Sequence, residues 1–151
     1  MKAVENNFDD LKVNELLKKH FIELRSVSPA GSTHVLDIDG LKDKTIKFWS
    51  IWNNEDLIGC GAIKILSESD GEFKSIRVHD RFREKGFGKK IISILISKSR
   101  SIGLNNVFIE TGSGKFFEPA RKLFKSCGFE KCEPFGHYKN DPNSCYMKIN
   151  F

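Results

Sequence analysis

The sequence is poor in the features that mark secreted, metal-binding and membrane proteins. Its four cysteines are Cys60, Cys127, Cys132 and Cys145, and none forms a C-x-x-C pair or accompanies a His-x3–5-His spacing, so no zinc site is expected. The opening MKAVENNFDD has no apolar segment, and no apolar run approaches a membrane span. We therefore expect reduced thiols, a cytoplasmic location, no metal and no membrane attachment.

The chain has 151 residues, of which 39% are hydrophobic and 30% charged, as expected for one globular domain over residues 1–151. Its net charge of +5 is concentrated, because residues 74–90 hold seven Lys or Arg against two Asp or Glu and the remainder is balanced. A local excess of cations favours an anionic ligand. Nucleic-acid surfaces usually need a longer basic stripe, so we expect none, with a nucleic-acid-binding protein kept as an alternative.

Hydrophobic periodicity predicts a sheet with helices around it. The spacing of apolar residues predicts helices over 8–27, 36–41, 88–101 and 116–127. Strand-like runs are expected at 2–5, 45–52, 57–66, 72–78, 107–111 and 144–151. Hairpins come first and a β-α-β crossover follows, so the fold class is α/β (α+β), with a mixed, mostly antiparallel central sheet flanked by helices. His20, on the first helix, is expected at the surface.

The segment HDRFREKGFGKK, residues 79–90, places two glycines and several cations between a strand and a helix. The first turn of a helix has N–H groups without intrahelical partners and a partial positive charge. Glycines let the oxygens of an anion approach that backbone, and the flanking cations add charge. The pattern predicts a phosphate-binding loop, with an ordinary turn whose charges face water as the alternative.

Two common phosphate loops fit this segment poorly. A Walker A loop requires G-x-x-x-x-G-K-[ST], but Lys90 follows Lys89 and Arg83 replaces the first glycine. A dinucleotide fingerprint requires G-x-G-x-x-G, and Ile91 occupies the place of its third glycine. Glu110 lies about a strand and a helix further on, so the dinucleotide alternative is weakened rather than excluded.

Two motifs follow the strand expected at 72–78. R-x-x-G-x-G begins at Arg83, and A-x-x-L-F-x-x-x-G-F occupies residues 120–129. With this spacing and this order of elements, nearly the whole chain resembles the GNAT family of acyl-CoA-dependent N-acetyltransferases. Stretches such as GCGAIK (59–64) and IETGS (109–113) are similar to a subgroup of small bacterial stand-alone acetyltransferases.

The resemblance implies where acetyl-CoA binds. Backbone groups of a short strand segment would pair with the pantetheine amides, as an added strand pairs with an open sheet edge. Backbone N–H groups of the glycine loop would hold the pyrophosphate, with Arg83 bracing the loop. Phe117 stands where the family often has an asparagine near the pantetheine. The cofactor-binding residues expected are Ile76, Arg77, Val78, Arg83, Glu84, Lys85, Gly86, Phe87, Gly88, Lys89 and Phe117.

Acetyl transfer to an amine requires removal of an ammonium proton, since a free alkylammonium has a pKa near ~10. Glu72 is the candidate base, because it lies six residues before Val78 on the same strand and is expected to share its face. An exposed carboxylate paired with Lys74 or Arg77 is the alternative. The N–H of Ile76 or Val78 is the expected donor to the oxyanion.

The acid is less clear from the sequence. The family commonly has a tyrosine where Phe124 stands, and phenylalanine cannot donate a proton. Either water protonates the leaving thiolate or the acid lies elsewhere. Tyr138 is the candidate catalytic acid and Tyr146 the alternative, although either could be a core aromatic.

The acceptor pocket is expected between the turn after the first helix and the C-terminal segment. Its candidate residues are Arg25, Ser28, His34 and Ser144. Arg25 could clamp an acceptor carboxylate or could be a solvated helix-end residue. The expected partners are acetyl-CoA and a small-molecule amine, in a monomer or homodimer. A protein N-terminal or lysine acetyltransferase and a non-catalytic acetyl-CoA sensor remain alternatives.

Overall fold

The computed structural model describes residues 1–151. The strands are β1 (Lys2–Glu5), β2 (Ile46–Asn53), β3 (Asp56–Ile65), β4 (Asp70–Val78), β5 (Asn106–Gly112), β6 (Glu130–Lys131) and β7 (Ser144–Asn150). The helices are α1 (Leu11–Val27), α2 (Ile38–Leu41), α3 (Phe87–Ser101) and α4 (Glu118–Ser126), with 3-10 helices η1 (Asp80–Phe82) and η2 (Lys115–Phe117). No helix combines the length and the apolar character needed to cross a membrane.

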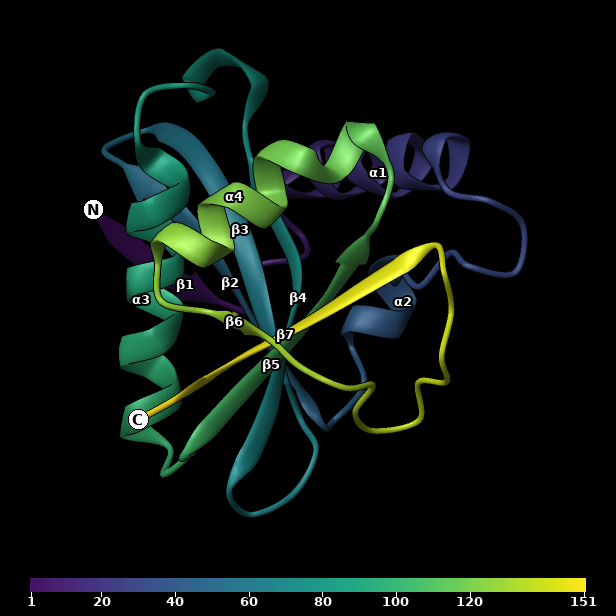
Figure 1. The fold of residues 1–151 in the computed structure, drawn as a ribbon. Coiled ribbons are helices and arrows are strands. Elements are labelled where there is room, and N and C mark those ends of the chain that lie inside the picture. The colour runs from purple at the N-terminus through teal and green to yellow at the C-terminus, as the bar shows by residue number, and fades with distance from the viewer.

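The helices cover both faces of a single seven-stranded sheet, as Figure 1 shows. The strand order is β1-β2-β3-β4-β5-β7-β6, and every neighbouring pair is antiparallel except β4 and β5. Helices α3 and α4 bury Ile91 and Phe124 against one face, whereas α1 and α2 bury Leu17 and Leu41 against the other. The predicted mixed, mostly antiparallel sheet flanked by helices is confirmed.

Helix α1 begins at Leu11, later than hydrophobic periodicity predicts, because the Asp10 side chain caps its first turn by accepting two backbone N–H groups. The expectation that His20 lies at the surface is wrong, since only 6% of it is exposed. His20 follows Leu16 and Leu17 at helical spacing and faces the sheet with them. Burial lowers the pKa of its imidazole to about 4, so His20 is neutral at neutral pH.

Strands β4 and β5 are neighbours over only three residue pairs, from Asp70–Asn106 to Glu72–Phe108. Beyond these pairs the two strands separate. Ser75 lies close to this point with φ 53°, in the left-handed region, and the β3–β4 register shifts beside it. A bulge of this kind bends a strand and increases its twist. The second half of β4 therefore leaves its neighbour and exposes one of its edges.

The bulge at Ser75 overturns one expectation, because Glu72 and Val78 do not share a face of β4. Val78 packs with Phe73 against the core under α3 and α4. Glu72 and Phe73 are adjacent in the strand, so the side chain of Glu72 points to the opposite face, which α1 covers. One extra residue in a strand reverses the side-chain alternation of every residue after it.

Gly59 of β3 pairs with Val78 beyond the bulge and has no room for a side chain. A Cβ there would clash with the Arg77 carbonyl oxygen and lie 2.7 Å from Ile91 Cδ1. Replacing Gly59 by alanine should lower the free energy of unfolding by about 1–3 kcal/mol, measured by urea denaturation. Gly114→Ala is the control, because a Cβ at Gly114 meets no atom within 4 Å. Equal stability of the two variants would contradict the prediction.

Candidate functional site

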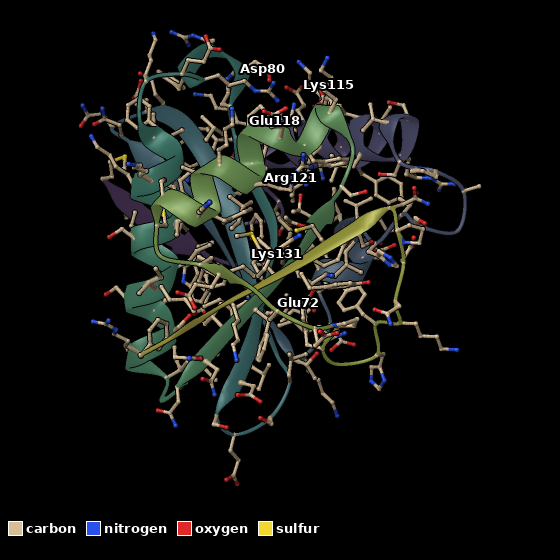
Figure 2. All side chains as sticks on the ribbon, in the orientation of Figure 1. Glu72, Asp80, Lys115, Glu118, Arg121 and Lys131 are labelled. Atoms are coloured by element: carbon tan, nitrogen blue, oxygen red, sulfur yellow. The ribbon has the colours of Figure 1, made fainter.

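The separation of β4 from β5 opens a cavity of about 620 Å³ in the middle of the sheet. Its walls come from β4, β5, the loop before α3, η2, α4 and the buried side of α1. Figure 2 shows Glu72 near the centre of the sheet and Lys115 at the start of the segment that leads into α4. The cavity is bordered by the open edge of β4 and by the beginning of α3. In both places backbone polar groups lack hydrogen-bond partners within the protein.

The loop before α3 presents a row of free N–H groups. No backbone N–H from Glu84 to Lys89 donates a hydrogen bond within the protein. Glu84 has φ 60° and Gly86 has φ 83°, so the chain passes twice through the left-handed region before the helix begins. Consecutive N–H groups in such a turn, at a helix N-terminus, form an anion-binding concavity. The row therefore fits a phosphate or diphosphate.

The side chains of the predicted cofactor residues divide into two groups. Those that line the cavity are Ile76, Arg77, Val78, Arg83, Glu84, Gly86, Gly88, Lys89 and Phe117. Lys85 and Phe87 contribute backbone to the loop, but their side chains lie outside the cavity; the Phe87 ring packs against Phe82 instead. Gly88 lies against α4, and a Cβ there would lie 2.7 Å from Leu123 Cδ2.

The exposed edge of β4 adds a second set of backbone groups. The N–H of His79 donates to the Ile58 carbonyl on β3 at 2.7 Å. Because the N–H groups of a strand alternate between its two edges, the N–H of Val78 points the other way, toward the space that β5 has left. An extended molecule in the cavity can pair with this edge as an added strand would.

Two arginines hold the loop and α1 against β4. The Arg77 guanidinium is 5% exposed and donates to Glu23 at 2.8 and 3.3 Å and to Asp80 at 3.3 Å. Arg83 lies 3.2 Å from Asp80 and 3.6 Å from Glu23. The hydrogen bond from Arg77 lowers the pKa of Glu23, and the hydrogen bond from Lys19 is the largest cause of the lowered pKa of Asp80. Both carboxylates are therefore ionised at neutral pH.

The two residues proposed from the sequence as catalytic are in direct contact. The Tyr138 hydroxyl donates to Glu72 Oε2 at 2.6 Å, and Lys74 Nζ lies 3.3 Å from the same oxygen and 3.1 Å from the hydroxyl. Burial, followed by the charge of Glu72, raises the pKa of Tyr138 above its usual range. Tyr138 therefore keeps its proton at neutral pH and acts as a hydrogen-bond donor to Glu72.

A second cavity of about 310 Å³ adjoins the first at the ends of α1 and β5. Of the predicted acceptor residues, Ser28 and His34 line it. His34 and the predicted cofactor residue Phe117 line both cavities. The Arg121 guanidinium donates to the carbonyls of Gly112 and Gly114 at 2.7 and 2.8 Å, which fixes the wall between β5 and α4. No group of three or more His, Cys, Asp or Glu side chains is arranged to hold a metal ion.

The structure does not bring the other two predicted acceptor residues into either cavity. Arg25 is on the exposed side of α1 with its guanidinium over the Phe21 ring. Ser144 faces Gly112 across the β5–β7 pair and lies close to Glu110, but its hydroxyl is buried without a hydrogen-bond partner. His34, which lines both cavities, also packs edge-on against Tyr138, with the two ring centroids 5.0 Å apart.

Glu110 is the residue of this site that the sequence did not single out for acetyl transfer. It lies near the end of β5 and lines both cavities. The Ser144 hydroxyl lies close enough to its carboxylate to lower its pKa, but makes no hydrogen bond of normal geometry with it. The only local signal is a carboxylate within IETGS at the end of an apolar strand. This carboxylate reaches the cavities only because β4 and β5 separate, which no local sequence pattern reveals.

The comparisons with known proteins agree with this geometry. The model of the Acetyltransferase (GNAT) family matches residues 12–129. The uncharacterized N-acetyltransferase YsnE of Bacillus subtilis is 41% identical, with 92% of this chain and 94% of that protein covered. YedL of Escherichia coli, also named an uncharacterized N-acetyltransferase, is 33% identical over 93% and 91%. An IAA acetyltransferase of Azospirillum brasilense is 32% identical over 83% and 81%.

Solved structures share the fold at lower identity. A Klebsiella pneumoniae structure described as a putative acyl-CoA N-acyltransferase matches with a TM-score of 0.78 and 21% identity, over 99% of this chain and 96% of its own. A Bacillus subtilis acetyltransferase solved in complex with CoA matches with a TM-score of 0.75 and 15% identity, over 99% and 98%. The whole fold of this chain is therefore shared with these solved structures.

Proposed function

The chain belongs to the GNAT acetyltransferase family and is an acetyl-CoA-dependent acetyltransferase, and from this we propose that it acetylates the primary amine of a small, amino-acid-like molecule by direct attack. The observation that carries the proposal is the junction of two cavities. One has a row of free N–H groups suited to a diphosphate, and the other is lined by both polar and apolar residues and is large enough for a small molecule.

Two parts of acetyl-CoA, the anionic pyrophosphate and the pantetheine amides, fit the larger cavity. The N–H groups from Glu84 to Lys89 would receive the pyrophosphate, and Arg83 and Lys89 add positive charge at the cavity wall. The exposed edge of β4 at Val78 would pair with the pantetheine amides. The acetyl group is then placed along the same edge of β4, where the N–H of Ile76 or Val78 that is not paired with the pantetheine can donate to the oxyanion of the tetrahedral intermediate.

The smaller cavity supports a small acceptor. Its volume of about 310 Å³ lies at the lower end of the range for small-molecule sites. Ser28 and His34 supply polar contacts, Lys115 a cation and Glu110 a carboxylate. An acceptor with an amine and an anionic group matches this set of charges. The Azospirillum relative is named for another acceptor, IAA, so we propose the acceptor class from the cavity rather than from the relatives.

Tyr138 and Glu72 act in this proposal as a positioning pair. Tyr138 lines neither cavity, and its raised pKa opposes loss of its proton to a thiolate. Since the thiolate of CoA has a pKa near ~8.5, it leaves as an adequate leaving group and takes its proton from water or from the attacking amine. Glu72 lines the larger cavity and holds Tyr138 and Lys74 in place.

Thiol release tests the proposed activity. The purified protein is mixed with acetyl-CoA and, one at a time, with the common amino acids, simple alkylamines and a lysine-containing peptide, and free CoA is measured with a thiol-reactive dye. We expect amine-dependent release with free amino-acid-like amines. CoA binding without release from any amine would favour the sensor alternative, and release with the peptide alone would favour a protein acetyltransferase. The absence of CoA binding would contradict the proposal altogether.

The four free cysteines are consistent with a reducing compartment, and we place the reaction in the cytoplasm on that basis.

A further inference from the structure

We infer that Glu110, and not Glu72, is the group that takes the proton from the ammonium of the acceptor, while Glu72 fixes Tyr138 and Lys74 beside the reaction. This inference rests on the proposed N-acetylation and assigns its general base. It also places the acceptor, because the reacting nitrogen must then lie where the two cavities meet, with the rest of the molecule in the smaller cavity.

The positions of Glu110 and Glu72 relative to the two cavities differ. Glu110 is the carboxylate that lines both cavities, whereas Glu72 lines only the larger one. A base must lie within hydrogen-bond reach of the proton that it removes, in the place where donor and acceptor molecules meet. Glu110 sits beyond Phe108, the last residue of β5 that pairs with β4, so the separation of the strands leaves its side chain at the junction.

The hydrogen-bond partners of the two carboxylates also differ. Glu72 is 3% exposed, and its Oε2 already accepts from the Tyr138 hydroxyl and from Lys74. A buried carboxylate held by two donors is a structural anchor, because protonation would weaken both contacts. Glu110 is half-buried, and the only neutral donor close to it is the Ser144 hydroxyl, which makes no hydrogen bond of normal geometry, so its oxygens can receive an ammonium proton.

The electrostatic surroundings of Glu110 also suit a proton acceptor. Burial away from water is the largest cause of the raised pKa of Glu110, and the negative charge of Glu72 adds to it. The nearby Ser144 hydroxyl from β7, followed by His34 from the loop after α1 and Lys74 from β4, lowers the pKa, but burial outweighs them. Tyr138 and Tyr146 face the same region and keep their protons, since the pKa of each is raised. A carboxylate with a raised pKa is a better proton acceptor than an ordinary glutamate.

The proton and electron balance of the step is simple. The acceptor ammonium gives one proton to the Glu110 carboxylate, and the freed nitrogen lone pair forms the C–N bond with the thioester carbonyl carbon. The carbonyl electron pair moves to oxygen and returns as the C–S bond breaks, so that CoA leaves as a thiolate. The second nitrogen proton goes to the thiolate, directly or through water, and Glu110 returns its proton to solvent.

The test compares E110Q with the matched variant E72Q, after CoA binding by calorimetry has shown that each retains the folded donor site. Each is assayed by thiol release with the best amine of the panel and with 2,2,2-trifluoroethylamine, whose electron-withdrawing group leaves it neutral at pH 7. For the ordinary amine, kcat/KM of E110Q should fall by roughly 10²–10⁴-fold at pH 7. The loss should shrink with trifluoroethylamine and as the pH approaches the amine pKa of ~10, because a neutral amine needs no base.

Different outcomes separate this inference from the proposed function. Any loss in E72Q should persist with trifluoroethylamine, because a positioning role does not depend on the charge of the amine. Full activity of E110Q, or rescue of E72Q alone by the neutral amine, would overturn the assignment of Glu110 and leave the acetyltransferase intact. If E110Q does not fold, the pH profile of the wild type decides. The rise of kcat/KM with pH should have an apparent pKa above that of an ordinary glutamate, and an apparent pKa below that value contradicts the inference. No thiol release from the wild type with any amine contradicts both.

Discussion

The Gly86→Asp variant should bind CoA roughly 100-fold more weakly than the wild type in isothermal titration calorimetry. Gly86 is at the centre of the row of free N–H groups and has φ 83°, with nothing within 4 Å of an added Cβ. An aspartate there meets no steric obstacle, so its carboxylate can occupy the N–H groups and repel a diphosphate. Loss of two charge-assisted hydrogen bonds at about 1.5 kcal/mol each corresponds to roughly two decades in Kd.

Gly103 provides a matched control for this variant. It follows the opposite end of α3, has φ 88° and also has nothing within 4 Å of an added Cβ. Gly103→Asp therefore imposes the same backbone strain, of about 1–2 kcal/mol, and the same added charge. It should lower stability as much as Gly86→Asp does while leaving CoA affinity unchanged. Equal CoA affinity of Gly86→Asp and wild type would show that the loop does not hold the diphosphate.

The loop of free N–H groups before α3 could be predicted from the sequence because its signal is local. A strand, two glycines, several cations and an apolar helix follow one another within residues 72–101, and each acts on its immediate neighbours. The apolar periodicity of the other elements is also local, and for that reason the order of strands and helices was predicted correctly apart from the two-residue strand β6 and the 3-10 helices η1 and η2. The family motifs then added the donor, which composition and spacing alone left open.

The polar centre of the site could be predicted only in part, because its contacts span the chain. Tyr138 and Glu72 are 66 residues apart, and each was a candidate for a separate reason, but only the fold shows that they touch. The bulge at Ser75 moves the side chains of the following β4 residues to the opposite faces of the sheet. Residue 75 adopts a left-handed conformation although it is a serine, so the sequence does not mark it as glycine would. Glu110 gains its place from the same separation of strands. Sequence reasoning failed where one irregular residue redirected a long strand.

Replacing Arg77 by methionine should lower the free energy of unfolding by about 3 kcal/mol, a fall in Tm of roughly 6–12 °C in a chain of this size. Arg77 is a buried cation whose guanidinium joins Glu23 of α1 to Asp80 of η1. Removing one partner of a buried ion pair leaves the other charges without compensation. The expected loss is at the lower end of the usual range because both carboxylates are partly exposed and Arg83 still contacts them.

The pH dependence of this loss follows from the two carboxylates. The pKa values of Glu23 and Asp80 are lowered in the folded protein, so the stability they contribute is present above the unfolded pKa of ~4 and is lost as the pH falls through the folded values. The Tm difference between wild type and Arg77→Met should therefore narrow below pH ~4. Arg81→Met is the control, because its side chain is 71% exposed and lies 3.9 Å from Asp56; it should change Tm little. A Tm difference that stays constant on acidification would mean that Arg77 stabilises the fold through packing of its side chain, and that α1 is held to β4 without the ion pairs.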